Sequence, residues 1–283
     1  MTQSSPLVSA QWLNEHLNDE SLFILDASII DLQSNTSIPA IAGSLAFDYA
    51  NVFCDQQSTL PNTMPSAERF TEQAQKIGLS QHNTIVVYDQ KGLFYAPRAW
   101  WMFKTMGFDK VYILAGGLPK WLALGYKTQT TTPALRSKGN FTANFAQYSW
   151  VDSNCVLAAI SGTASTSSSS ATKPIVIDVR SAARFDAIER ESRAGLRSGH
   201  IPNSVNFPFT TLVSNGELKP INELQASFSA HMPNKEHHYI FSCGSGVTAC
   251  ITLLAATTLG YKHLAVYDGS WTDWGSNHNL PII

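Results

Sequence analysis

The chain has 283 residues, of which 44% are hydrophobic and 14% charged, and its formal net charge is -2. This length is enough for two typical domains, and the lack of a basic excess excludes a general binder of nucleic acid or of anionic membranes. The N-terminal segment lacks the basic and apolar regions of a signal peptide. The sequence contains no apolar run of about eighteen residues, so no membrane span is expected. Four cysteines without a CxxC pair do not form a disulfide framework, so we expect reduced thiols and a cytoplasmic protein.

The sequence repeats itself once along the chain. "VSAQWLNEHL" followed by "LFILDAS" is similar to "VDSNCVLAAI" followed by "PIVIDVR", and the two apolar runs end in Asp26 and Asp178. "IAGSLAFDY" then corresponds to "IPNSVNFPF", and "NTIVVYDQKGLFYAPRAWW" corresponds to "HHYIFSCGSGVTACITLL". Both copies close on a tryptophan, Trp121 or Trp274. A repeat of this kind predicts a duplicated domain.

The repeat also gives the expected domain limits. The first copy spans residues 1–127, residues 128–147 have little periodicity and are interpreted as a linker, and the second copy spans residues 148–283. Within each copy, apolar runs alternate with helix-length segments, which predicts an α/β domain with a mainly parallel sheet flanked by helices. A Ser-rich segment, residues 161–171, interrupts the second copy and is interpreted as a surface insertion.

Cys243 has a setting that the other cysteines lack. It follows the apolar run "YIFS" and precedes Gly-Ser-Gly and a helix expected over about 247–259. Glycines let backbone amides converge on one point, and a helix N-terminus adds partial positive charge, so this loop favours a thiolate over a thiol. Cys54, Cys155 and Cys250 are instead interpreted as small buried hydrophobic residues.

The first copy serves as an internal control for this interpretation. Its residue at the position of Cys243 is Asp89, which cannot perform sulfur chemistry, so we expect one catalytic and one supporting copy. Phosphatases of the Cys-x5-Arg type also hold a thiolate in such a loop, but they need an arginine six residues after the cysteine. This chain has Ala249 there, which disfavours a phosphatase and favours sulfur transfer.

These motifs, together with "DVRSAARF", "SGHIPNS" and "YDGSWTDWG", resemble the rhodanese superfamily over nearly the whole chain. Within it, the chain is most similar to the tandem-domain 3-mercaptopyruvate sulfurtransferases. The resemblance implies two tandem rhodanese-like domains and a reaction in which sulfur passes from 3-mercaptopyruvate through a Cys243 persulfide, releasing pyruvate. It implies a cyanide, small-thiol or thioredoxin acceptor and neither a metal nor an organic cofactor.

The resemblance also implies roles for individual residues. Arg184 and Arg193 match the arginines that hold the carboxylate and ketone of the substrate, although on their own both would be interpreted as solvated surface charges. Ser245 is implied to donate a hydrogen bond near the reacting sulfur or the ketone. The loop residues implied to bind the substrate or the persulfide are Gly244, Gly246, Val247 and Thr248.

The composition of the loop bears on the donor. Thiosulfate sulfurtransferases of this superfamily carry basic residues just after the cysteine, whereas Gly244 and Ser245 are neutral. This favours 3-mercaptopyruvate, which carries a single carboxylate, over dianionic thiosulfate. A thiosulfate:cyanide sulfurtransferase and a non-catalytic rhodanese-like sulfur carrier remain as alternatives.

The chain departs from the family pattern at one position. In related enzymes an Asp and a His of the first domain assist the loop serine as a relay, and the matching segment here is "CDQQSTLPNTMP". Asp55 matches the Asp, but Asn62 stands at the position of the His, and an amide does not accept a proton near neutral pH. The activation of Ser245 and the relay role of Asp55 are therefore open.

Other polar and aromatic residues are interpreted as structural. His200 is expected to fix a loop by hydrogen bonding, and Trp100 and Trp101 are expected in the core or at a domain interface. Asp26 and Asp178 close buried strands and are expected to bond loop amides.

Overall fold

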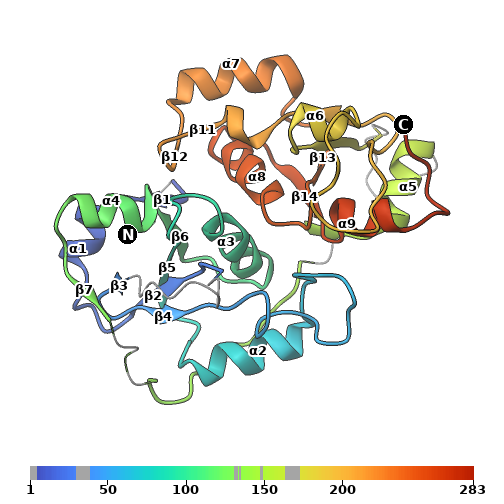
Figure 1. The fold of residues 1–283 in the computed structure, drawn as a ribbon. Helices are drawn as coiled ribbons and strands as arrows, with labels where there is room; N and C mark the ends of the chain where they lie inside the picture. The colour runs from blue at the N-terminus through green and yellow to red at the C-terminus, as the bar shows by residue number, and fades with distance from the viewer. Residues whose placement is uncertain (1–4, 30–38, 131–132, 134, 147–148, 163–172) are drawn as a thin grey trace. The chain divides into compact units, whose positions relative to one another are not determined.

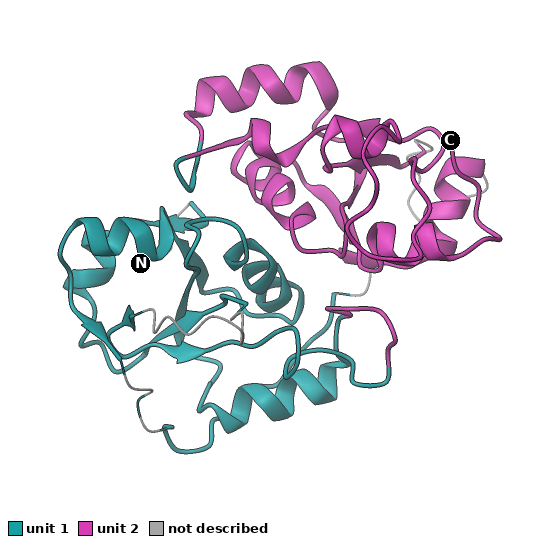
Figure 2. Cartoon of the chain, viewed as in Figure 1, with its two compact units in different colours: residues 1–57, 64–146, 215–218 teal, residues 58–63, 147–214, 219–283 magenta. Residues whose placement is uncertain are grey.

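The computed structural model describes residues 5–29, 39–130, 133, 135–146, 149–162 and 173–283 (Figure 1). The chain divides into two compact units (Figure 2). Unit 1 comprises residues 1–57, 64–146 and 215–218, and unit 2 comprises residues 58–63, 147–214 and 219–283. Unit 2 therefore includes one short segment from the N-terminal half of the chain, residues 58–63, and unit 1 includes one from the C-terminal half, residues 215–218. The predicted Ser-rich insertion lies almost wholly outside the described residues.

Unit 1 is built on a five-stranded parallel sheet in the order β1-β6-β5-β2-β4. Its central strands are continuous apolar runs, as expected for parallel strands that are covered on both faces. A short antiparallel pair, β3 and β7, lies beside it. The strands of this unit are β1 (Leu7–Val8), β2 (Leu22–Asp26), β3 (Ala40–Ile41), β4 (Leu45–Ala46), β5 (Thr84–Tyr88), β6 (Val111–Leu114), β7 (Thr128–Gln129) and β12 (Glu217–Leu218).

Helices cover both faces of this sheet (Figure 1). Leu22 and Ile24 of β2 point to one face and join a core cluster that includes Trp121. On the other face, the rings of Phe70 and Phe103 pack edge to face with centroids 5.2 Å apart. The helices are α1 (Ala10–Glu15), α2 (Ala67–Lys76), α3 (Ala96–Thr105) and α4 (Gly117–Ala123).

Unit 2 repeats this plan with the sheet order β10-β9-β13-β14-β8, again with parallel pairs throughout. The strand order is the same as in unit 1 when each strand is matched to its sequence counterpart, so the predicted duplicated α/β fold is confirmed. The strands are β8 (Trp150–Val151), β9 (Ile175–Asp178), β10 (Val205–Asn206), β11 (Val213–Ser214), β13 (His238–Ser242) and β14 (His263–Tyr267). The helices are α5 (Ser153–Ser161), α6 (Ala182–Phe185), η2 (Phe209–Thr211), α7 (Ile221–His231), α8 (Ala249–Thr258) and α9 (Ser270–Ser276).

The segment interpreted as a linker, residues 128–147, packs against unit 1 where it is described. Phe141 is fully buried, and its amide donates to the carbonyl of Leu79 at 3.1 Å. The amide of Asn144 donates to Met106 at 2.9 Å. Unit 1 accordingly extends to residue 146, and the limits 1–127 and 148–283 stay a prediction.

The helix after Cys243 is slightly shorter than predicted. It is α8, which begins at Ala249 because Val247 and Thr248 still belong to the preceding loop. Gly260 follows its C-cap with φ +85°, the left-handed conformation that commonly ends helices.

All four cysteines are free. Of the three cysteines other than Cys243, each predicted to be buried, two are buried. Cys54 and Cys250 are buried, but Cys155 is exposed, so that prediction was wrong. Cys155 lies in the first turn of α5, where its amide donates to the capping side chain of Asp152. The buried stripe of that helix begins one residue later, at Val156.

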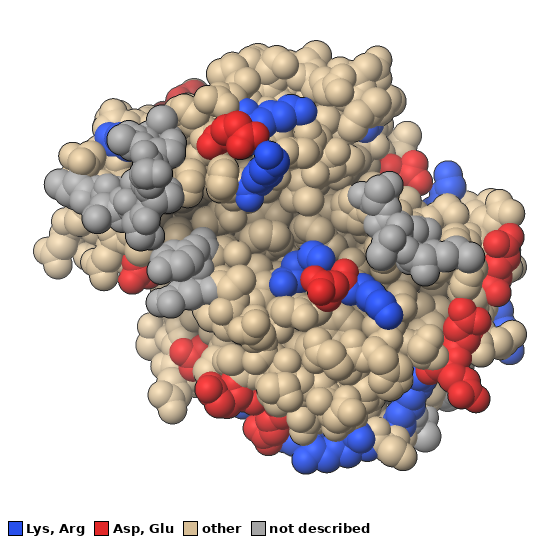
Figure 3. Space-filling model, turned by 180° about the vertical axis from the view of Figure 1, so that it is seen from behind, with Lys and Arg blue, Asp and Glu red and all other residues tan. Residues whose placement is uncertain are grey.

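The distribution of charge agrees with the small net charge. On the face drawn in Figure 3, acidic and basic side chains are interspersed over a largely uncharged surface. Over the described ranges, no helix has both the length and the hydropathy to cross a membrane.

Candidate active site

Cys243 lies at the carboxyl end of β13, in the middle of the unit 2 sheet. Strand β13 pairs with β9 on one side and β14 on the other, and the chain then enters the loop 243–248 before α8. Ligand sites in open α/β sheets lie outside the carboxyl ends of such strands. Cys243 is 1% exposed, so water has little access to its sulfur in this conformation.

One hydroxyl group ties this loop together. The amides of Cys243 and Gly246 both donate to Ser270 Oγ at 3.1 Å, and Ser270 Oγ in turn donates to the carbonyl of Tyr267 at 2.8 Å. The same oxygen lies 4.0 Å from Cys243 Sγ. Ser270 adopts φ +50°, a left-handed conformation that costs a residue with a side chain about 1–2 kcal/mol. Its hydrogen bonds to the loop offset that strain.

The matching loop of unit 1 holds an anion of its own. Asp89 Oδ2 accepts the amides of Phe94, Tyr95 and Ala96, each at 2.8 Å. Its other oxygen accepts the amide of Lys91 at 2.7 Å. Amides at the start of α3 therefore converge on one negative charge, which is the behaviour that the Gly-containing loop predicted for the position of Cys243.

In unit 2 the corresponding donors are available. Within the described part of the chain, no acceptor is paired with the backbone amides of Gly244, Ser245, Val247 and Thr248. Gly246, with φ +72°, provides the turn between them. A loop with these amides directed away from internal partners can receive an anionic sulfur or a substrate oxygen.

Arg184 lies beside this loop. A β-carbon built on Gly244 would stand 3.6 Å from Arg184 Nη2. The side chain of Arg184 is 25% exposed and forms an ion pair with Glu191. Burial of the guanidinium opposes its charge, but the hydrogen bond and the negative charge of Glu191 outweigh this effect and raise the pKa of Arg184. Arg184 is thus a paired cation next to the nucleophile loop, not a freely solvated charge.

Arg193 reaches the same loop through Thr272. Arg193 Nη1 donates to Thr272 Oγ1 at 2.8 Å, and Thr272 Oγ1 donates to the carbonyl of Gly244 at 2.7 Å. The Thr272 amide donates to that carbonyl as well, at 2.9 Å. The two arginines predicted from the sequence are therefore both brought to the backbone of Gly244, by different routes.

Ser245 has a partner in unit 2. Asn62 Nδ2 donates to Ser245 Oγ at 3.2 Å and to the Ser245 carbonyl at 3.4 Å. Because the amide donates, the hydroxyl oxygen of Ser245 accepts and its proton can be directed elsewhere. Asp55 belongs to unit 1, where its Oδ1 accepts the amide of Gln57 at 2.9 Å. The relay role of Asp55 stays a prediction.

The residues interpreted as structural behave in that way. His200 Nδ1 is bonded to the carbonyl of Phe185 at 2.9 Å, and its ring stacks on that phenyl ring. Trp100 is 2% exposed and its indole donates to the carbonyl of Val111. Asp26 and Asp178 each accept the amide two residues along the chain.

Sequence reasoning missed three residues that shape the site: Ser270, Thr272 and Glu191. A signal for Ser270 was present in the repeat, because "YDGSWTDW" corresponds to "AGGLPKW" and places Ser270 opposite Gly117. Gly117 has φ +51°, nearly the same value as Ser270. A serine that replaces glycine at a left-handed position is a candidate for a special hydrogen-bonding role.

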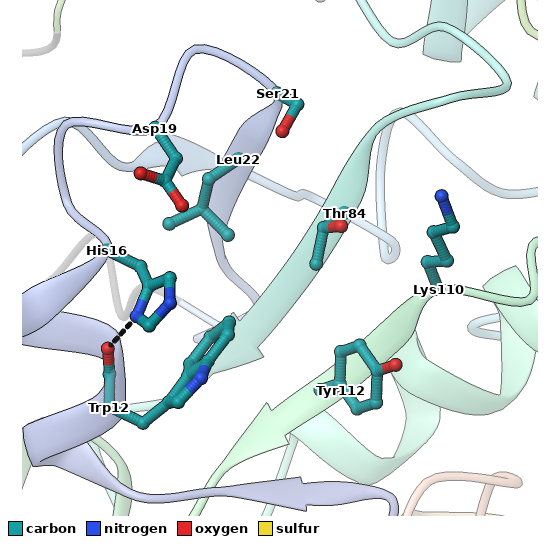
Figure 4. Close-up of a pocket in the computed structure, with 8 residues that line it drawn as sticks. All are labelled: Trp12, His16, Asp19, Ser21, Leu22, Thr84, Lys110 and Tyr112. Carbon is teal, nitrogen blue, oxygen red and sulfur yellow. Dashed lines mark hydrogen bonds between the residues drawn. The ribbon is translucent and has the colours of Figure 1, made fainter. Parts of the chain in front are cut away.

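A separate cavity of about 270 Å³ lies in unit 1, at the amino ends of β2 and β5 (Figure 4). Trp12 and His16 form its aromatic wall, with ring centroids 4.2 Å apart. No cysteine is among the residues that line it. Its lining residues are Trp12, His16, Asp19, Ser21, Leu22, Thr84, Lys110 and Tyr112.

Comparison with known proteins gives the family. Residues 9–124 and 165–277 each match the Rhodanese-like domain. The chain belongs to the rhodanese family. It is 38% identical to the 3-mercaptopyruvate sulfurtransferase of Escherichia coli K12, over 97% of this rhodanese chain and 96% of that protein. It is 34% identical to the thiosulfate sulfurtransferase of Gallus gallus, over 95% and 92%.

Solved structures agree. The crystal structure of SseA from Escherichia coli, described as a 3-mercaptopyruvate sulfotransferase, matches this rhodanese chain with a TM-score of 0.80 and 36% identity. The match covers 95% of this chain and 99% of that one. The tandem rhodanese architecture predicted from the sequence is confirmed.

Proposed function

We propose that this rhodanese-family chain is a 3-mercaptopyruvate sulfurtransferase in which Cys243 carries the sulfur. The observation that carries the proposal is the loop 243–248, where a buried cysteine is followed by four backbone amides, those of Gly244, Ser245, Val247 and Thr248, that have no acceptor among the described residues. The similarity to curated 3-mercaptopyruvate sulfurtransferases over nearly the full chain supports the same donor.

In the first half-reaction, the Cys243 thiolate attacks the sulfur of 3-mercaptopyruvate. An S–S bond forms and the C–S bond breaks, and its electron pair passes into the enolate of pyruvate. The proton of the donor thiol ends on the enolate carbon, which gives pyruvate and the Cys243 persulfide anion. Arg184 and Arg193 hold the carboxylate and the developing enolate oxygen, and the Ser245 hydroxyl donates near the reacting sulfur or the ketone.

In the second half-reaction, an acceptor anion attacks the outer sulfur of the persulfide. The new bond forms as the S–S bond breaks, and the electron pair returns to the Cys243 thiolate. Cyanide gives thiocyanate and a thiolate gives a persulfide, so the enzyme follows a ping-pong scheme. The loop amides of Gly244, Ser245, Val247 and Thr248 stabilise the persulfide anion between the two steps. A protein thiol such as thioredoxin as the acceptor and a cytoplasmic location stay predictions.

Thiosulfate is the second candidate donor. The similarity to a thiosulfate sulfurtransferase favours it, but the loop places neutral Gly244 and Ser245 after the cysteine. A dianion loses more hydration energy than a monoanion on entering a site of this size, and it needs more compensating cations. We therefore expect thiosulfate to be the poorer donor.

The test compares pyruvate release from 3-mercaptopyruvate with thiocyanate formation from thiosulfate and cyanide. Wild type should favour 3-mercaptopyruvate, Cys243→Ser should abolish both activities, and Cys155→Ser should match wild type. Exposure to the donor should add about 32 Da, one sulfur atom, to the peptide that contains Cys243. Equal rates for wild type and Cys243→Ser would refute an enzymatic role for this cysteine, and a strong preference for thiosulfate would refute the choice of donor.

A further inference from the structure

The carboxylate of Glu191 is buried between two arginines. Its side chain is 2% exposed, and Oε1 accepts from Arg180 Nη1 at 2.7 Å and from Arg184 Nε at 3.3 Å. Oε2 accepts from Arg184 Nη2. A buried carboxylate is tolerated only when it is paired and hydrogen-bonded, and here both oxygens meet that condition.

Arg180 is held firmly on the other side. Its side chain is 1% exposed, and Nε lies 3.0 Å from each carboxylate oxygen of Asp178, the last residue of β9. Arg180 Nη2 also donates to the carbonyl of Gly199 at 2.9 Å, and the guanidinium lies 4.1 Å from the ring of Trp271. These contacts fix Arg180 against the end of the sheet, and Glu191 is fixed through it.

Among the residues that the structure describes, Glu191 is the only one recorded as hydrogen-bonded to the guanidinium of Arg184. Arg184 belongs to α6, a single turn of four residues, and its side chain is the one member of this cluster with substantial exposure, at 25%. A free arginine side chain has about 2 kcal/mol of rotamer entropy to lose when it is ordered. Glu191 engages Nε and Nη2, and Nη2 is also the nitrogen that lies next to Gly244, so the guanidinium is held beside the loop before any substrate arrives.

We propose that Glu191 is a positioning residue for the donor half-reaction: it transmits the rigidity of the Asp178–Arg180 pair to Arg184 and orients that guanidinium toward the donor. The inference rests on the proposed function, because Arg184 meets the donor only in that scheme. Discharge of the persulfide to a small acceptor such as cyanide does not need Arg184 to hold a carboxylate. Glu191 therefore acts on one half-reaction and not on the other.

The experiment separates the two half-reactions in Glu191→Gln. The glutamine keeps the shape of the side chain but places an amide NH2 against an arginine donor, so Arg184 loses part of its support. A reacting group displaced by about 1 Å costs roughly 100-fold, so we expect the single-turnover rate of pyruvate release from 3-mercaptopyruvate to fall about 10- to 100-fold. The rate at which a preloaded persulfide is discharged to cyanide should stay within about twofold of wild type. Glu189→Gln, which removes an exposed carboxylate from the same segment, should match wild type in both steps.

A double-mutant cycle tests whether Glu191 acts through Arg184. Adding Glu191→Gln to Arg184→Ala should cost less than about twofold in the donor step, because the group that Glu191 positions is already gone. Glu191→Asp keeps the negative charge but shortens the side chain by one methylene, and it should show the same selective loss. It replaces Glu191→Gln in the experiment if that variant does not fold.

Three results would overturn the inference: a donor step equal to wild type in both Glu191 variants, an equal loss in both half-reactions, or independent effects in the cycle. These results are distinct from a failure of the proposed function. If wild type itself releases no pyruvate, the donor assignment fails. If wild type releases pyruvate and the Glu191 variants behave like it, only the role of Glu191 fails.

Discussion

Asn62 Nδ2 lies 3.2 Å from Ser245 Oγ, so an amide that can only donate at this nitrogen faces the hydroxyl of the nucleophile loop. Asn62 also has φ +61°, a left-handed conformation that asparagine adopts more readily than most residues. The side chain therefore fixes the direction of the Ser245 hydroxyl without accepting its proton. This arrangement leaves the proton of Ser245 for the substrate.

Asn62→Gly should lower kcat for pyruvate release by up to about 10-fold, the equivalent of one hydrogen bond of about 0.5–1.5 kcal/mol. Asn62→Asp should lower it further, because a carboxylate would accept the Ser245 proton and turn it away from the substrate. Glycine adopts the left-handed backbone conformation of residue 62 without strain, so the unfolding free energy of the Asn62→Gly variant should stay close to that of wild type. Turnover by Asn62→Asp equal to or above that of Asn62→Gly would contradict this account of the hydroxyl.

Ser270 is predicted to be necessary for the shape of the nucleophile loop. Ser270→Ala leaves the buried amides of Cys243 and Gly246 without their shared acceptor, which costs about 1–3 kcal/mol for each group. We expect a lower unfolding free energy in urea and at least about a 10-fold loss of sulfur transfer.

Ser270→Gly separates backbone strain from hydrogen bonding. It removes the same hydroxyl but relieves the left-handed strain, as Gly117 does in the first copy. It should be more stable than Ser270→Ala by about 1 kcal/mol and equally impaired in sulfur transfer. If either variant transferred sulfur at the wild-type rate, the loop would hold its shape without this hydroxyl.

Asp89 is predicted to be structural although it occupies the position of the nucleophile. Asp89→Asn replaces an oxygen that accepts backbone amides with a group that cannot accept all of them. Bonds from amides to a charged acceptor contribute about 1.5–3 kcal/mol, so we expect a loss of about 2 kcal/mol in unfolding free energy. The rate of sulfur transfer per folded molecule should stay within about twofold, measured by active-site labelling of Cys243. If the rate of sulfur transfer per folded molecule fell more than 10-fold, Asp89 would have a part in the reaction.

The sequence allowed the architecture and the nucleophile to be predicted because both leave local signals. The repeat, the alternation of apolar runs with helix-length segments, and the strand followed by Cys-Gly-Ser-Gly are all visible over short spans. Glu191 left no such signal, because its role depends on ion pairs with Arg180 and Arg184 that form only in the folded protein. Cys155 was misplaced because its helix is apolar along only one stripe, and the stripe begins at Val156. The role of Glu191 and the exposure of Cys155 are determined by contacts in the folded protein, which the local sequence does not reveal.

The stability of unit 2 should fall in mild acid because of His238. Burial of its ring, and the neighbouring His263 and His237, lower the pKa of His238 in the folded state. The rings of His238 and His263 stack with centroids 4.6 Å apart, so a proton on one opposes a proton on the other. The carboxylate of Glu236 lies 4.0 Å from His263 Nε2 and also pairs with Lys262 at 3.3 Å.

The sign of the effect follows from the lowered pKa. The unfolded chain takes up this proton more readily than the folded chain, so protons favour unfolding and stability falls as pH drops below the ordinary histidine pKa of about 6.5. His238→Gln removes the group and should show a smaller decrease in unfolding free energy between about pH 7.5 and pH 5.5 than wild type. Urea unfolding at both pH values, with His82→Gln in unit 1 as the control, measures this difference. An acid-induced decrease in His238→Gln as large as that of wild type would mean that other groups cause it.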